Sequence, residues 1–159
     1  MIFRFPFAAA LALQLGLALA FAPSSYELPA WFKQSFLLIA EDIEEAAAKD
    51  KRIILFFGQN GCPYCKKLVE VNFNHDEIVA YTRKHFEVIA LNIFGAREVL
   101  WVDGKTRPEK ELATHLKVRA TPTLIFVDEQ GKIVQRLTGY DPPEEFFALL
   151  KNAAGEKID

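Results

Sequence analysis

The sequence predicts an α/β fold in which a central mixed sheet is flanked by helices, with an insert after the second central strand. The first indication is the apolar run Arg52 to Phe57, which is typical of a strand covered by helices on both faces. The second is the order of helical and strand patterns, which is α, β, α, β, an insert, then β, β, α. The third is Glu129-Gln130-Gly131 between two apolar runs, which indicates a hairpin and therefore antiparallel pairing within the sheet.

The chain begins with the features of a secretory signal peptide. Arg4 precedes an apolar stretch from Phe5 to Leu19, and the pattern Ala18-Leu19-Ala20 predicts cleavage after Ala20. An uncleaved anchor is the alternative, and either form places the cysteines outside the cytoplasm. We therefore expect a signal peptide over residues 1–20, a linker over 21–30 and one domain over 31–159.

Composition limits the partners of this domain. A hydrophobic content of 51% with 25% charged residues suits a compact fold with a single core. A formal net charge of −2, without any basic cluster, argues against nucleic acid as a partner. We expect a monomer.

The first helix is predicted from Trp31 to Lys49, because apolar residues recur there at helical spacing. These residues are Phe36, Ile39, Ala40, Ile43 and Ala47. The buried strand Arg52 to Phe57 follows. A second helix is predicted from Cys62 to about Asn72.

A third helix is predicted to end at His85, and Asn74 with Glu77 forms a candidate capping box at its start. The run Phe86 to Ile93 has few polar positions, so it is predicted to be the second strand of the sheet.

The predicted insert spans about residues 94–117. Within it, Thr106 and Glu109 form a second candidate capping box, for a helix that runs to Leu116. Trp101 is expected to pack the insert against the sheet, and a contact with a partner protein is the alternative.

The last three elements are two strands and a helix. The strands are predicted at Thr123 to Asp128 and Lys132 to Leu137. Asp141-Pro142-Pro143-Glu144 is a strong helix start, with Asp141 as the N-cap and proline in the first turn, and the helix is expected to reach about Asn152.

Cys62 and Cys65 are the only cysteines, and they are predicted to lie at the start of the second helix. Pro63 fits the first turn, where its missing N–H would have no helical partner. A sulfur at a helix N-terminus is favoured as a thiolate by free N–H groups and the helix dipole, so Cys62 is the expected attacking sulfur. Cys65, one turn further on, would resolve the mixed disulfide. Lys66 and Lys67 are expected to add positive charge near the thiolate.

The cysteine pair has two alternative roles, as a structural disulfide or as a metal site. A structural disulfide is disfavoured because a bridge across two residues closes almost no loop. A zinc site is disfavoured because tetrahedral zinc usually takes four ligands, and His75, His85 and His115 are not at metal-ligand spacing from the pair. We expect no metal and no dissociable cofactor, since the redox-active disulfide Cys62-Cys65 is itself the working group.

Several motifs together resemble the thioredoxin superfamily. They are the order of elements, Cys62-Pro63-Tyr64-Cys65 between a strand and a helix, Thr121-Pro122 before a strand, and Gly139 before the last helix. The resemblance implies a thioredoxin fold in which Pro122 is cis and faces the disulfide. It also implies a substrate groove in which an extended peptide pairs with the backbone of Thr121. The groove residues would be Gly61, Pro63, Tyr64, Thr121, Pro122 and Gly139. An ordinary surface turn is the alternative for Pro122.

The chain departs from thioredoxin at positions that affect the chemistry. Gly61 stands where thioredoxin has Trp, and Phe56 and Ala90 stand where it has a buried Asp and the Lys that partners that Asp. Without this proton acceptor, water or a surface carboxylate must serve Cys65, so resolution is expected to be slower near neutral pH. Pro-Tyr between the cysteines is also found in glutaredoxins, whose potentials are roughly −200 to −230 mV, so we expect a potential less reducing than that of thioredoxin.

The insert resembles that of exported thioredoxin-like proteins of the SoxW type. The residues concerned are Asn92-Ile93-Phe94-Gly95, Trp101-Val102-Asp103-Gly104-Lys105 and the helix before Val118. The resemblance implies a periplasmic thiol-disulfide oxidoreductase that acts as a reductase of protein disulfides. Electrons would come from a membrane thiol transporter of the DsbD or CcdA type. Clients would be cysteines of sulfur oxidation or of cytochrome c maturation.

Two competing functions remain open from the sequence. A disulfide isomerase or oxidase would share the motif, and threonine before the cis-proline also resembles the isomerase branch, although those isomerases carry a separate dimerisation domain that this short chain lacks. A copper-binding metallochaperone without catalysis would use the same two thiolates as ligands.

Overall fold

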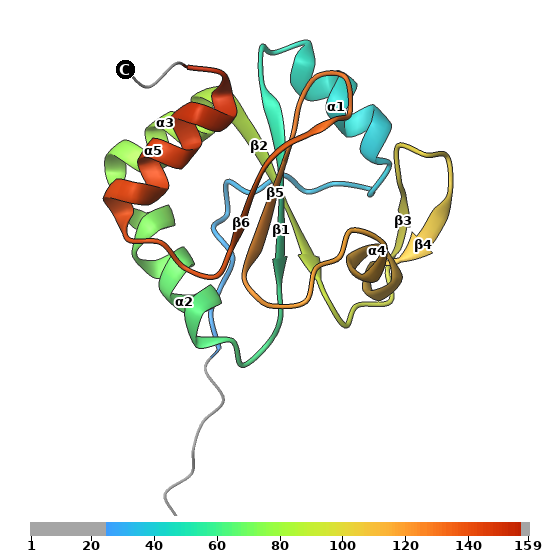
Figure 1. Cartoon of the computed structure of the whole chain (residues 1–159), viewed down its shortest axis with the longest axis horizontal. Coiled ribbons are helices and arrows are strands. Elements are labelled where there is room, and N and C mark those ends of the chain that lie inside the picture. The colour runs from blue at the N-terminus through green and yellow to red at the C-terminus, as the bar shows by residue number, and fades with distance from the viewer. Residues whose placement is uncertain (1–24, 157–159) are drawn as a thin grey trace, which may run out of the picture.

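The computed structural model describes residues 25–156 and shows a four-stranded sheet with helices on both faces (Figure 1). The strand order is β2-β1-β5-β6. β1 (Arg52–Gly58) pairs in parallel with β2 (Phe86–Asn92), while β5 (Thr123–Val127) is antiparallel to β1 and to β6 (Ile133–Thr138). The predicted mixed sheet and hairpin are confirmed. The expected signal peptide, its cleavage site and the first residues of the expected linker lie outside the described residues.

Side chains of the central strands point alternately to the two faces of the sheet and pack into two separate hydrophobic cores. Ile54, Phe56, Leu124 and Phe126 face the side covered by α2 (Pro63–Glu70), η1 (Asn72–Asn74), α3 (Asp76–His85) and α5 (Pro143–Ala154). Ile53, Leu55, Phe57 and Ile125 face the side covered by α1 (Ile39–Ala47), the hairpin of β3 (Glu98–Leu100) with β4 (Thr106–Pro108), and α4 (Glu109–His115). A strand buried on both faces is the physical reason that Arg52 to Phe57 has no polar alternation.

The first helix is shorter than predicted. It begins at Ile39, not at Trp31, because Leu37 has a left-handed backbone (φ 61°) and the Ser35 hydroxyl accepts a hydrogen bond from the Leu37 N–H at 2.7 Å. The residues before it extend along the outer edge of β2, where the Lys33 N–H bonds to the Val88 carbonyl at 2.8 Å. Phe36, counted in the predicted apolar stripe, is 94% exposed.

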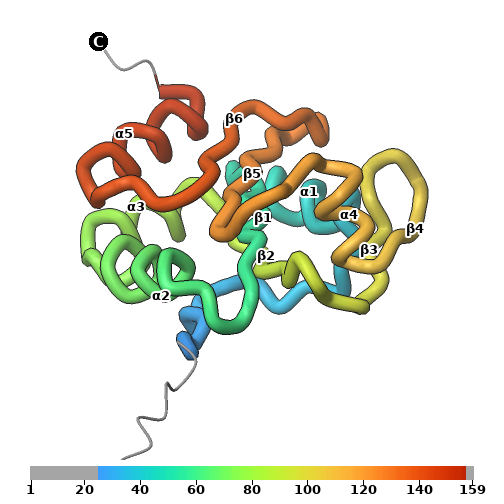
Figure 2. Tube along the Cα trace, turned by 60° about the horizontal axis from the view of Figure 1, so that its bottom comes forward, coloured from blue at the N-terminus to red at the C-terminus, as the bar shows by residue number. Residues whose placement is uncertain are grey.

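This N-terminal segment packs on the domain as far back as Tyr26. The Lys66 ammonium donates to the Ser25 carbonyl at 3.2 Å. A Cβ at Gly58 would lie 2.5 Å from the Tyr26 hydroxyl, so glycine allows the segment to approach β1. Figure 2 shows the segment running beside α2 and the loop that follows β1.

The predicted helix caps are wrong in all three cases. Asn74 lies inside η1, and α3 begins after His75 without a side-chain cap. Thr106 lies in β4, and α4 begins after Pro108. Pro143 holds the preceding Pro142 in an extended conformation (ψ 160°), which moves the N-cap of α5 from Asp141 to Pro142.

The insert is fastened by a buried carboxylate. Glu109 is 2% exposed, and its side chain accepts hydrogen bonds from the backbone N–H of Asn92 at 2.9 Å and from the Arg97 guanidinium at 2.5 Å. The residue proposed as half of a capping box therefore turns inward and ties α4 to the end of β2. Trp101 is 5% exposed within the core beneath α1, which confirms its predicted packing role.

Candidate active site

The cysteine pair lies at the junction between the end of β1 and the start of α2. The loop after Gly58 reverses direction at Gly61, whose φ of 75° favours glycine. Cys62 is the N-cap of α2, Pro63 occupies the first turn, and the Cys65 N–H donates to the Cys62 sulfur at 3.1 Å. The structure confirms that Cys62 lies at a helix N-terminus, with its sulfur taking the place of a capping oxygen.

The two sulfurs form a disulfide, and their residues differ in access. The Cα atoms of Cys62 and Cys65 are 5.2 Å apart. Cys62 is 4% exposed, whereas Cys65 is 0% exposed within the core that α2, α3 and α5 cover. This small difference in exposure agrees with the expected role of Cys62 as the attacking sulfur, which stays a prediction.

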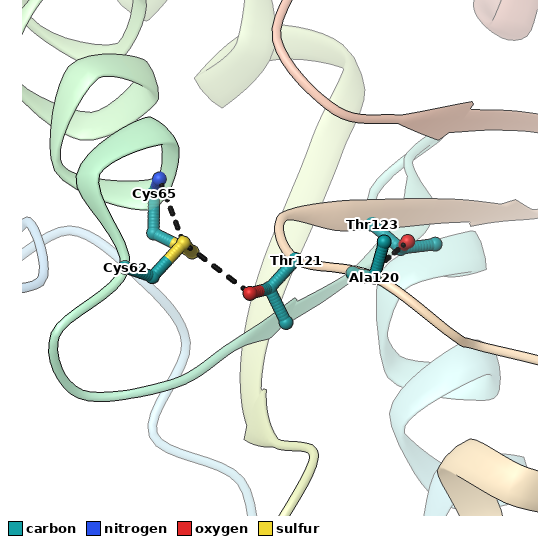
Figure 3. The surroundings of a disulfide bond; sticks show 5 residues. All are labelled: Cys62, Cys65, Ala120, Thr121 and Thr123. Atoms are coloured by element: carbon teal, nitrogen blue, oxygen red, sulfur yellow. Dashed lines mark hydrogen bonds between the residues drawn. A yellow bond between two sulfur atoms is a disulfide. The ribbon is translucent and has the colours of Figure 1, made fainter.

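Thr121 faces this disulfide from the loop before β5. Its hydroxyl donates to the Cys62 sulfur at 3.3 Å (Figure 3). The Thr121–Pro122 peptide bond is cis. Thr123, two residues on, directs its hydroxyl away from the disulfide to the Ala120 carbonyl at 2.8 Å. The fold thus brings together two parts of the predicted site that are 59 residues apart in sequence.

Gly139 joins the same group through the backbone. Its N–H donates to the Pro122 carbonyl at 2.8 Å, and its φ is 93°. A Cβ at Gly61 or at Gly139 would meet no atom within 4 Å, so the surface next to both glycines is open. Gly61, Pro63 and Tyr64 lie on the α2 side and Thr121, Pro122 and Gly139 on the sheet side; their role as a peptide groove stays a prediction.

The two lysines after the motif are engaged elsewhere. Lys66 pairs with Glu70 at 2.7 Å and bonds to the Ser25 carbonyl. The Lys67 ammonium lies 4.3 Å from the centre of the Tyr140 ring. Among the described residues, the hydrogen-bond donors to the Cys62 sulfur are thus the Cys65 N–H and the Thr121 hydroxyl, and not a lysine.

The surroundings of Cys65 are apolar. Phe56 is 1% exposed in the same core, and its ring centroid lies 6.0 Å from that of Phe32. Phe56 and Ala90 also line a cavity of about 380 Å³ beside Tyr26, whose pKa is raised by burial and lowered in part by a hydrogen bond with the Gln59 backbone. No carboxylate in the part of the chain that the structure describes forms a hydrogen bond with Cys65.

Residues 25–156 lack the features of a clustered metal site and of a membrane-spanning helix. No group of three or more His, Cys, Asp or Glu side chains gathers there as a metal site would require. None of the helices in this range combines the length and apolar character needed to span a bilayer.

Sequence reasoning missed Tyr140 and the hydroxyl contact of Thr121. Tyr140 directly follows Gly139, and its ring stacks on that of Tyr64 with centroids 6.5 Å apart. Its position next to a predicted groove glycine was the available signal. The Thr121 hydroxyl contact depends on where the loop before β5 lies relative to α2, which local sequence patterns do not specify.

The sequence of this chain is similar to those of known proteins. A family model described as a thioredoxin-like domain matches residues 39–154. The disulfide bond reductase DsbH of Chlamydia pneumoniae is 31% identical over 110 residues, which cover 65% of this chain and 61% of that protein. The match therefore spans less than two thirds of that relative.

Solved structures of other proteins share the fold of this chain. A thioredoxin-fold protein from Helicobacter pylori is 30% identical, with a TM-score of 0.57 and coverage of 69% of this chain and 75% of that one. A thioredoxin from Thermus thermophilus is 27% identical, with a TM-score of 0.56 and coverage of 72% and 82%. The predicted fold is thus confirmed, and the matched range 39–154 contains Cys62, Cys65, Thr121, Pro122 and Gly139.

Proposed function

This chain belongs to the thioredoxin-like domain family, and we propose that its Cys62–Cys65 pair makes it a thiol-disulfide oxidoreductase that reduces disulfides of exported proteins. The name of the Chlamydia pneumoniae relative, a disulfide bond reductase, supports the reducing direction. The chemistry requires no dissociable cofactor, because the dithiol itself carries two electrons.

In the reduced protein, the Cys62 thiolate attacks one sulfur of a client disulfide. A new bond forms between Cys62 and that sulfur, and the other client sulfur leaves as a thiolate that takes up a proton. Cys65 then loses its proton and attacks the Cys62 sulfur, which forms the Cys62–Cys65 disulfide and releases the second client thiol. The client gains two electrons, and a reductant of the dithiol class must later return two electrons and two protons to the pair.

One observation carries the proposal, which is the position of the Cys62 sulfur. It lies at the N-terminus of α2, accepts hydrogen bonds from the Cys65 N–H and the Thr121 hydroxyl, and is bonded to the fully buried Cys65. Donors at a helix N-terminus stabilise a thiolate, which is both the attacking species and the better leaving group. A structural disulfide has no need of this arrangement.

The setting of the reaction forms part of the same proposal. A signal peptide over residues 1–20 would deliver the domain to the periplasm, where a membrane thiol transporter of the DsbD or CcdA type would supply electrons. The resemblance of the insert to SoxW-type proteins supports clients in sulfur oxidation or cytochrome c maturation. We propose that the protein works as a monomer.

The test uses purified full-length mature protein in its reduced form with a disulfide-bonded protein substrate. Wild type should reduce the substrate, Cys65→Ser should accumulate a mixed disulfide through Cys62, and Cys62→Ser should do neither. The oxidised protein, given a reduced client, tests the opposite direction, and faster oxidation than reduction would favour an oxidase. Stoichiometric Cu(I) retention without any disulfide exchange would replace the proposal with a metallochaperone.

A further inference from the structure

A stacked pair of aromatic rings, one exposed and one half-buried, borders the cysteine pair. Tyr64, between the two cysteines, is 59% exposed, and its ring stacks on Tyr140 with centroids 6.5 Å apart and planes 21° apart. Tyr140 follows Gly139, whose N–H is bonded to the Pro122 carbonyl. The pair therefore connects the start of α2 to the loop that carries Thr121 and Pro122.

A positive charge lies on this pair. The Lys67 ammonium is 4.3 Å from the Tyr140 ring centroid, which is a cation–π contact. Lys66 is neutralised by Glu70, but within residues 25–156 no carboxylate lies at ion-pair distance from Lys67. The rings and the ammonium thus present apolar surface and uncompensated charge side by side.

The surface next to these groups has room for a polypeptide. A Cβ at Gly139 would meet nothing within 4 Å, and the same holds at Gly61. Glycine at both positions leaves the backbone bare, so a client segment that reaches Cys62 can lie close to it. Tyr64 contributes little to the core, since most of its side chain faces solvent.

We propose that Tyr64, Tyr140 and Lys67, called here the aromatic-cation patch, determine which client segments react fastest at Cys62. The patch selects an extended segment in which a large apolar side chain and an acidic side chain flank the target cysteine. The apolar side chain packs on the exposed Tyr64 ring and on the uncovered part of the Tyr140 ring, and the carboxylate pairs with Lys67. This inference rests on the proposed function, because it names the substrate class of the same site.

The test measures reduction of short peptides that carry one cysteine in a mixed disulfide with a chromogenic thiol. The first, called the glutamate peptide, has phenylalanine and glutamate beside the cysteine; the second, the lysine peptide, has phenylalanine and lysine; the third, the glycine peptide, has glycine and glutamate. Wild type should react roughly threefold to fivefold faster with the glutamate peptide than with the lysine peptide, and the ratio should fall as salt is added. The glycine peptide should react more slowly than the glutamate peptide.

Matched variants assign the selectivity to the patch. Lys67→Gln should bring the glutamate-to-lysine rate ratio close to one, whereas Lys110→Gln on α4, which removes the same charge from the other side of the sheet, should leave it unchanged. Tyr140→Leu, which keeps apolar volume, and Tyr64→Ala should each reduce the advantage of phenylalanine over glycine. Each variant is compared with itself on two peptides, so a change in the intrinsic reactivity of Cys62 cancels.

The outcomes separate the two proposals. If wild type reduces none of the peptides and no protein disulfide, the proposed function fails and the inference fails with it. If all peptides are reduced at equal rates, the function stands and the aromatic-cation patch is rejected as a specificity determinant. Selectivity that survives Lys67→Gln and Tyr140→Leu also rejects it.

Discussion

Thr121 and Cys62 meet through a single hydroxyl-to-sulfur contact of 3.3 Å. A hydroxyl donates more strongly to a charged acceptor than to a neutral one, so this contact should favour the thiolate of the reduced protein over the thiol. The resemblance implies only a backbone role for Thr121 in binding peptide. From the hydroxyl contact we expect the side chain of Thr121 also to tune the reactivity of Cys62.

Thr121→Val removes this donor and keeps the shape of the side chain. We expect the pH midpoint for alkylation of Cys62 to rise by about 0.7 pH units, since a charge-assisted hydrogen bond exceeds a neutral one by about 1 kcal/mol. Thr123→Val is the matched control, because that hydroxyl bonds to the Ala120 carbonyl and not to sulfur. An unchanged midpoint in Thr121→Val, or an equal rise in both variants, contradicts the assignment.

Phe56 leaves Cys65 without a buried proton acceptor. Phe56→Asp should speed the step in which Cys65 releases the client by about tenfold or more near neutral pH, because a carboxylate can accept the Cys65 proton there. The variant should also be less stable, since an unpaired carboxylate is costly to bury. Stopped-flow measurement of client release across pH checks the rate.

Phe56→Asn controls for the loss of packing. Asparagine resembles aspartate in size and polarity, but its amide cannot accept the proton as a carboxylate does. It should leave the pH profile of client release like that of wild type. If Phe56→Asp shows the wild-type profile while folded, the absence of an acceptor is not what limits Cys65.

Among the helices and strands, Glu109 shows why the insert could be predicted from the sequence, whereas the contacts that hold α4 to the end of β2 could not. The spacing of Thr106 and Glu109 fits a capping box, and the helix after it exists. The side chain instead turns inward, where a partner 12 residues earlier, Arg97, and the backbone of Asn92 complete its hydrogen bonds. Gly95 permits this, because a Cβ there would collide with the Glu109 carboxylate.

Glu109→Gln should lower the free energy of unfolding by about 1–3 kcal/mol, because it weakens the ion pair with Arg97 and leaves buried groups imperfectly paired. Urea unfolding followed by circular dichroism measures this. Glu111→Gln, an exposed position of the same helix, should change the free energy by less than about 0.5 kcal/mol. Equal effects in the two variants would show that the buried carboxylate does not fasten the insert.

The segment before α1 shows a second limit of local patterns. Helical spacing from Phe36 to Ala47 suggested one long helix, but only the part from Ile39 onward packs as a helix. The Ser35 side chain and the left-handed Leu37 stop the helix, and the preceding segment instead makes a backbone hydrogen bond to β2 through Lys33. The hydrogen bond to β2 depends on a strand about 50 residues later, so no local sequence pattern could have predicted it.

For the whole molecule, the strands and the cysteine helix could be predicted because burial on two faces and the Cys62-Pro63-Tyr64-Cys65 motif leave local signals. The contact of Thr121 with Cys62 and that of Gly139 with Pro122 could not be predicted from local sequence patterns. They depend on β5 lying antiparallel beside β1, which brings the loop before β5 to the end of β1 that leads into α2. The expectation that these residues lie together comes from the resemblance to the thioredoxin superfamily and not from local sequence patterns.

The reduction potential is a property of the whole site. Pro63 and Tyr64 between the cysteines predict a potential less reducing than that of thioredoxin, which is about −270 mV. Equilibration of the purified protein with glutathione buffers, followed by separation of the reduced and oxidised forms, gives the value. A potential at or below about −270 mV rejects the prediction.

Cys62 and Cys65 are proposed to work as a reductase that is kept reduced from the membrane. Acid-quenched thiol trapping of the pair in intact cells, with and without the membrane thiol transporter, tests this proposal. We predict a pair that is mostly reduced in the first case and oxidised in the second. A pair oxidised in both cases would contradict the claim and indicate that the protein acts as an oxidant.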